Sequence, residues 1–106
     1  MLHCQLIKIG ADLISLVASL KDEEIIACDL ESSGLDTKLS KLEGIGLGTS
    51  SEQYFIPYPN TFTPIQIKNT LSEVFKDKRV VFHNAKFDLK LLYENGLPWP
   101  EIFDDT

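Results

Sequence analysis

The second half of the sequence alternates strand-like and helix-like segments, and this alternation limits the possible folds more than any other feature. The short apolar runs 80–82 and 102–103 are separated by a helical pattern at 85–95, and a helical pattern at 64–75, with Thr63 as its N-cap, precedes them. A helix between two strands of one sheet makes a parallel crossover, which is right-handed in almost all proteins. The alternation therefore predicts a mixed α/β sheet with helices on its faces.

The first half of the sequence predicts one helix and three strands that form a meander. Leucines at helical spacing indicate a helix over 11–21, and the almost uninterrupted apolar run 25–30 predicts a strand covered on both faces. Segments 42–49 and 54–58 are expected to be antiparallel strands, because the polar stretch 50–52 between them has the composition of a hairpin turn.

Length and composition narrow the class of protein. The 106 residues leave room for one domain, and 43% hydrophobic with 25% charged residues is the balance of an ordinary globular protein. The longest uncharged apolar stretch, Leu13–Leu20, is too short to span a bilayer, and no signal-like segment follows Met1, so the expected location is the cytoplasm. Cys4 and Cys28 are too few for a disulfide framework and are expected to be reduced, and His3 beside Cys4 indicates a terminal strand rather than a metal site.

The net charge bears on the kind of ligand. A value of −6 argues against a protein that neutralises nucleic-acid phosphates over a wide surface. It is compatible with a metal-dependent nuclease, because carboxylates hold the cations that meet the phosphate. Arg79, Lys86 and Lys90 are interpreted as scattered members of a solvated face, and Trp99 as a packing residue in the loop before the last strand.

Two acidic residues follow the first apolar strand. Asp29 and Glu31 are two positions apart, which places both carboxylates on one face of a strand with Cα atoms roughly 6.5 Å apart. Two such side chains can converge on one hard cation. The alternative is that they are only the solvated end of a strand entering a turn.

A second polar group opens the helix after the strand at 80–82. Asn84 and Asp88 are four positions apart and therefore project from one face of the first helical turn, towards the sheet end where Asp29 and Glu31 are expected. Alternatively, Asn84 is an N-cap and Asp88 a carboxylate favoured by the helix dipole. His83 adjoins this group and is interpreted as a structural or supporting residue.

Both groups carry a resemblance to a known family. The segment 29–36, DLESSGLD, resembles the first exonuclease motif of the DEDD superfamily, and 84–88, NAKFD, resembles its second. The segments 54–58 and 103–106 are similar to the proofreading 3′-5′ exonuclease domain of family A DNA polymerases, the DNA polymerase I type. The resemblance extends from about Ile25 to Thr106, and it implies a ribonuclease H-like α/β fold.

The resemblance also implies a metal site. Asp29, Glu31 and Asp88 would be the catalytic carboxylates and the ligands of two divalent ions, with Glu31 also orienting the attacking water or the terminal 3′ hydroxyl. Oxygen ligands and a phosphate substrate favour Mg²⁺ or Mn²⁺ over zinc. The implied substrate is the single-stranded 3′ end of DNA.

Three further residues would contact the substrate. Asn84 would position substrate and neighbouring ligands, Leu35 resembles the apolar residue that wedges between the last two bases, and Ser32 lies between the acidic pair and Leu35.

One part of the family pattern is missing. No Tyr-x-x-x-Asp or His-x-x-x-x-Asp motif follows Asp88, so the expectation is a partial exonuclease domain, 1–106, truncated before its last helices and retaining one of two ions. Asp104 and Asp105 precede the position of that motif and are interpreted as a loop or helix-cap pair. A polymerase domain is expected in the parent polypeptide. A non-catalytic exonuclease-like module and an RNA 3′-end exonuclease remain as alternatives.

Overall fold

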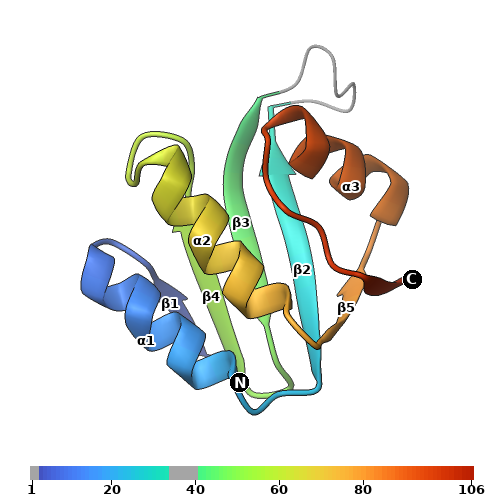
Figure 1. Ribbon diagram of the computed structural model, residues 1–106, viewed down its shortest axis with the longest axis horizontal. Coiled ribbons are helices and arrows are strands. Elements are labelled where there is room, and N and C mark those ends of the chain that lie inside the picture. Colours follow the sequence, from blue (N-terminus) through green and yellow to red (C-terminus); the bar gives the residue numbers. More distant parts are fainter. Residues whose placement is uncertain (1–2, 34–40) are drawn as a thin grey trace.

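The computed structural model describes residues 3–33 and 41–106, which form one sheet and three helices (Figure 1). The elements, in chain order, are β1 (His3–Leu6), α1 (Gly10–Leu20), β2 (Ile25–Ser32), β3 (Leu42–Gly48), β4 (Glu52–Pro57), α2 (Pro64–Phe75), β5 (Arg79–Phe82), α3 (Ala85–Glu94) and β6 (Ile102–Asp105). The expected mixed α/β arrangement is confirmed, with helix boundaries within a residue of those predicted.

The sheet has six strands in the order β1-β4-β3-β2-β5-β6. The predicted meander is confirmed, because β2 and β3 pair antiparallel and so do β3 and β4. β5 pairs parallel with β2, and β6 pairs parallel with β5, as the strand-helix-strand pattern predicted. The strand expected around His3 and Cys4 is β1, which lies parallel to β4 at one edge.

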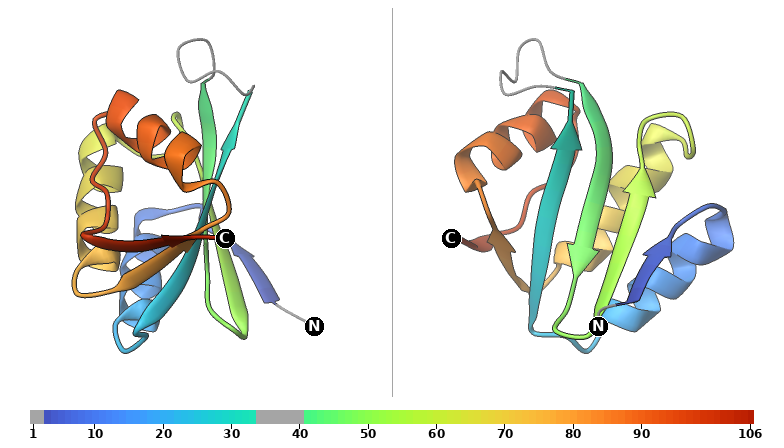
Figure 2. Two further views of the ribbon diagram at one scale, coloured as in Figure 1. Left: turned by 90° about the vertical axis from the view of Figure 1, so that its right-hand side faces the viewer. Right: turned by 180° about the vertical axis from the view of Figure 1, so that it is seen from behind.

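All three helices lie on the same side of the sheet, and the opposite side carries no helix of the described chain (Figure 2). This arrangement corrects the prediction that the strand at 25–30 is covered on both faces. In β2, Ile26, Cys28 and Leu30 are buried, whereas the residues between them are exposed. The apolar run was misleading because Ala27 is small enough to tolerate exposure and Ile25 stands at the exposed start of the strand.

The hydrophobic core lies between the sheet and the helices. Its fully buried side chains come from every layer, including Leu16 of α1, Ile45 of β3, Leu71 of α2 and Leu91 of α3. Burying each such side chain contributes roughly 1.5–3 kcal/mol. Cys28 is part of this core, and both Cys28 and the exposed Cys4 are free, as expected.

Candidate active site

The site is built where strand β2 extends beyond its neighbour β5. The register pairs Ile25–Cys28 with Arg79–Phe82, so β5 ends while β2 continues to Ser32 beside β3. Helix α3 begins three residues after β5. It packs against the end of β2, which is paired with β3 on one side but has no β5 partner on the other (Figure 1). The topology therefore brings the residues of the two acidic motifs to the same corner of the sheet.

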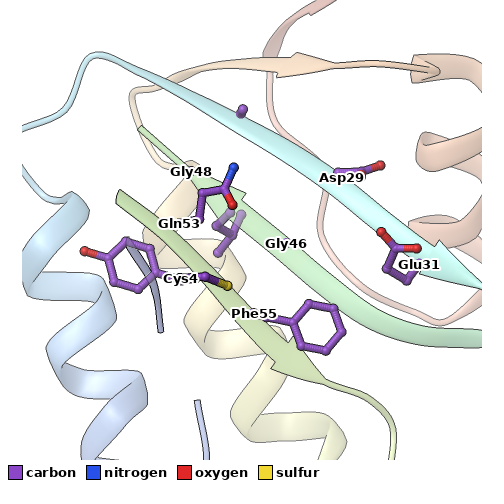
Figure 3. A pocket seen from close by; sticks show the side chains of 10 residues that line it. Cys4, Asp29, Glu31, Gly46, Gly48, Gln53 and Phe55 are labelled. Carbon is purple, nitrogen blue, oxygen red and sulfur yellow. The ribbon is translucent and has the colours of Figure 1, made fainter. Parts of the chain in front are cut away.

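Asp29 and Glu31 lie on the face of β2 that no helix covers. Their side chains point to the same side, as the two-residue spacing predicted, and Figure 3 shows them next to each other along the strand. They line a hollow of about 210 Å³ together with Gly46 of β3 and Phe55 of β4. The Asp-x-Glu pair thus opens onto a shallow depression that a ligand can enter.

Glycines of β3 form the floor of this depression. Gly46 is the register partner of Asp29, and a Cβ atom there would lie 3.2 Å from the Asp29 carbonyl oxygen. At Gly44 a Cβ atom would collide with the Phe55 ring, which lies over that glycine. A side chain at Gly46 would fill space beside the carboxylates, whereas Gly44 makes room for the Phe55 ring that lines the hollow.

Asp88 approaches the same stretch of β2 from helix α3. Its side chain is 3% exposed, and its Oδ2 atom has no hydrogen-bond partner among the described residues. Burial raises the pKa of Asp88 from 3.8 to about 7, and the charge of Asp29 adds to this shift. A backbone hydrogen bond from Leu30 opposes the rise in pKa, whereas the charge of Glu31 adds a smaller increase.

The causes of this pKa shift locate the three carboxylates relative to one another. Asp88 interacts with the Leu30 backbone and with the charges on both sides of it, Asp29 and Glu31. Asp88 does lie in the first turn of α3, as the helix-dipole alternative requires, but burial and the neighbouring carboxylates outweigh the dipole and raise its pKa. These interactions support the prediction that the two motifs meet at one corner of the sheet.

Asn84 occupies the N-cap position of α3. Its Oδ1 accepts a hydrogen bond from the Phe87 backbone at 3.4 Å, so the capping interpretation is confirmed. The side chain is exposed, which leaves its role towards a substrate as a prediction. His83 is exposed as well, and its Nδ1 lies 3.2 Å from the Thr106 hydroxyl.

Asp105 is a residue of the site that the sequence interpretation missed. Asp104 and Asp105 lie in strand β6, which corrects the loop alternative for this pair, whereas the helix-cap alternative holds for Asp105. The Asp105 carboxylate accepts a hydrogen bond from the Ala85 backbone at 3.1 Å, and its charge contributes to the raised pKa of Asp88. The helix that it caps, α3, lies 20 residues earlier in the chain.

The structure says little more about the two remaining residues that were predicted to contact the substrate, Ser32 and Leu35. Ser32 is half-buried at the end of β2, opposite Leu42, next to an irregularity in the strand register after Glu31. Leu35, the predicted wedge, lies outside the described residues.

This corner of the sheet offers carboxylate oxygens, which are suitable ligands for a hard cation, but they do not form a complete coordination sphere. Within residues 3–33 and 41–106, no set of three or more His, Cys, Asp or Glu side chains is arranged to hold a metal ion. The negative charges of Asp29 and Glu31 nonetheless repel that of Asp88, and the buried Oδ2 atom of Asp88 has no hydrogen-bond partner among the described residues. A divalent cation would relieve both conditions, so the residues present fit such an ion.

Solved structures with the same fold are exonuclease domains. The chain superposes on the Aedes aegypti Nibbler EXO domain with a TM-score of 0.80 at 15% identity, covering 97% of this chain and 52% of that one. Escherichia coli RNase D, an exoribonuclease, matches with a TM-score of 0.80 at 21% identity over 99% of this chain and 27% of that chain. These similarities confirm the ribonuclease H-like fold.

Sequence comparison identifies the family. A family model described as 3′-5′ exonuclease, the domain type found with A-type DNA polymerases, matches residues 4–106. The chain belongs to this family. DNA polymerase I of Borreliella burgdorferi is 35% identical over a 100-residue alignment that covers 88% of this chain and 11% of that protein. No described helix is long and apolar enough to cross a membrane.

Proposed function

We infer that this chain supplies the first two carboxylate motifs of a 3′-5′ exonuclease active site, which removes nucleotides from DNA 3′ ends as the proofreading activity of a DNA polymerase I-like protein. The observation that carries the proposal is the buried Asp88 carboxylate at Leu30, flanked by Asp29 and Glu31. A scaffold has no need to bury an unpaired carboxylate in the field of two others, because this costs folding free energy.

Mg²⁺ or Mn²⁺ is the proposed cofactor, held by Asp29, Glu31 and Asp88. Such ions supply electrophilic stabilisation of the phosphate under attack. The protein's own contribution is to fix the ligands: β2 presents Asp29 and Glu31 on the open face, and α3, capped by Asn84 and Asp105, fixes the position of Asp88. Gly46, which lines the hollow, leaves room beside the carboxylates for the terminal nucleotide.

DNA is preferred over RNA as the substrate class because the relative at 35% identity is a DNA polymerase I. The likeness to RNase D concerns the fold, at 21% identity. Comparing the affinities of a short DNA and an RNA of the same base sequence, in the presence of Mn²⁺, tests this preference. Tighter binding of the RNA would favour the exoribonuclease alternative.

Metal binding is the sharpest test of the site, because it reports directly on Asp29, Glu31 and Asp88 and does not depend on the family's third motif. Calorimetric titration with Mn²⁺ should show binding to the wild type and none to Asp29→Ala. The matched control is Asp104→Asn, which removes an exposed carboxylate outside the site and should bind as the wild type does. Equal binding by Asp29→Ala and the wild type would overturn the proposal and favour a non-catalytic module.

A further inference from the structure

A hollow lined by aromatic and basic side chains lies on the outer side of α3, away from the carboxylates. It has a volume of about 390 Å³ and is lined by residues of α3, of the following loop and of β6: Lys86, Leu89, Lys90, Tyr93, Trp99 and Phe103. We refer to these residues as the aromatic patch. Lys86 and Lys90, which were expected to be scattered cations on a solvated face, are brought together here.

The aromatic side chains of the patch are unusually exposed. Tyr93 is 67% exposed, Trp99 53% and Phe103 43%. The prediction that Trp99 is a packing residue is therefore only partly right: its ring lies 5.9 Å from that of Tyr93, with both rings open to solvent. Large apolar side chains that gather on a surface mark a binding site more often than single exposed ones do.

The charge of the patch indicates which ligand fits it. The chain carries a net charge of −6, yet the described residues that line this hollow include two lysines and no carboxylate. Exposed aromatic rings with neighbouring cations form the surface on which single-stranded nucleic acids bind, because bases stack on the rings and phosphates meet the cations. A purely apolar protein partner would not account for the two lysines.

The position of the patch connects it with the carboxylates. Lys86 lies in the first turn of α3, two residues before Asp88 and on the opposite side of the helix, while Tyr93 lies in the last turn. A strand whose 3′ end reaches Asp88 can therefore cross the N-terminus of α3 beside Lys86 and continue along the ten-residue helix, which is about 15 Å long.

We propose that the aromatic patch binds the nucleotides that precede the 3′ end of a single-stranded nucleic acid. This deepens the proposed function and rests on it for the direction of the strand. Trp99 and Tyr93 stack with bases, and Lys86 and Lys90 contact the phosphates between them.

Trp99 makes the proposal directly measurable, since it is the single tryptophan of the chain. Titration of the 106-residue protein with a dT₁₂ oligonucleotide, at low salt and in EDTA, should quench Trp99 fluorescence in a saturable way. Tyr93→Ala should weaken binding by about five- to a hundredfold, the range for losing one stacked base. Because Tyr93 is exposed, this variant is expected to keep its fold, which circular dichroism checks.

A pair of charge-reversal variants separates the patch from general electrostatics. The double variant Lys86→Glu with Lys90→Glu should abolish the quenching, whereas Lys68→Glu with Lys76→Glu, an equal charge change at exposed positions of α2 and its C-cap, should retain most of it. Equal losses in the two double variants, or the absence of quenching in the wild type, would overturn the proposal. Concentration-dependent dimerisation that Trp99→Ala abolishes would also overturn it, in favour of a contact between proteins.

The two proposals fail separately in these experiments. Binding at the patch is measured in EDTA, so it does not depend on a metal ion at the carboxylates, and none of the three carboxylates lines the patch. If the wild type binds dT₁₂ but not Mn²⁺, only the carboxylate site is contradicted. If the wild type binds Mn²⁺ but not dT₁₂, only the patch is contradicted.

Discussion

Helices α2 and α3 cross the same face of the sheet, but their N-termini are stabilised in different ways. The start of α2 is closed by its own sequence: Thr63 accepts a hydrogen bond from the Gln66 backbone at 3.1 Å, and Gln66 accepts one from the Thr63 backbone at 2.9 Å. The start of α3 has a longer cap from Asn84 and receives Asp105 from β6.

The two helices also differ in whether their first turn contains a buried carboxylate that destabilises the fold. The first turn of α2 contains no acidic residue, whereas that of α3 contains Asp88, buried with an unpaired oxygen and a pKa raised to about 7. A helix start that serves only the fold satisfies its polar groups locally. The start of α3 retains an unfavourable charge, which is the pattern of a functional site.

Asp88→Asn should have the largest effect on stability. In metal-free buffer the folded state binds more protons than the unfolded state between pH 3.8 and about 7, so the wild type should lose stability as the pH rises through this window. Each pKa unit corresponds to about 1.36 kcal/mol, so the rise from 3.8 to about 7 sets the loss at no more than about 4 kcal/mol. Urea unfolding from pH 4 to 8 measures it.

The asparagine variant removes the titration and should be more stable than the wild type at pH 8. Its stability should also vary less across the same range of pH. A wild type whose stability rises from pH 5 to pH 8 would contradict the raised pKa of Asp88.

Thr63→Ala should come next, with a loss of about 1 kcal/mol, because it removes the side-chain acceptor of the α2 capping box. Thr63→Ser is the matched control, since it keeps the hydroxyl. Urea unfolding at one pH is sufficient, because no buried titrating group lies in the first turn of α2. Equal losses in both variants would assign the effect to the methyl group instead of the cap.

Asn84→Ala should cost less than Thr63→Ala, about 0.5 kcal/mol, because the cap hydrogen bond of α3 is longer and Asp105 also serves this helix start. Asn84→Ser retains a capping oxygen and should lie between the alanine variant and the wild type. A loss larger than that of Thr63→Ala would show that Asn84 holds the site together more than its hydrogen bond indicates.

Asp105→Ala should have the smallest net effect at pH 8, because two contributions offset each other. The variant loses the hydrogen bond to Ala85, and it also relieves the repulsion between Asp105 and Asp88. At pH 5 Asp88 is protonated, so only the loss remains and the variant should be destabilised by about 0.5–1 kcal/mol. Identical effects at pH 5 and pH 8 would show that Asp105 and Asp88 do not interact.

The difference between the two helices also explains what the sequence could predict. The N-cap of α2, Thr63, was predicted from the sequence, because a helix start of this kind depends only on neighbouring residues. The same holds for Asp29 and Glu31, whose common side follows from strand geometry. The role of Asp105 depends on β6 pairing beside β5, which places it opposite Phe82 and next to α3. No local pattern contains that information.

Burial was harder to predict than position. The apolar run of β2 was taken as covered on both faces, because composition alone does not show which face the helices occupy. Likewise, Lys86 and Lys90 share one face of α3 because they are four positions apart, but only the packing of the loop after α3 brings Trp99 beside them. Contacts between distant segments decide both features.

The central claim is that Asp88 lies in the field of Asp29, and a carboxyl NMR titration tests it most directly. In metal-free buffer the Asp88 signal should titrate near pH 7 in the wild type, and Asp29→Asn should lower this pKa measurably, because it removes the largest like-charge contribution. Asp104→Asn, outside the site, should leave it unchanged. An Asp88 pKa that is the same in the wild type and in Asp29→Asn would contradict the account.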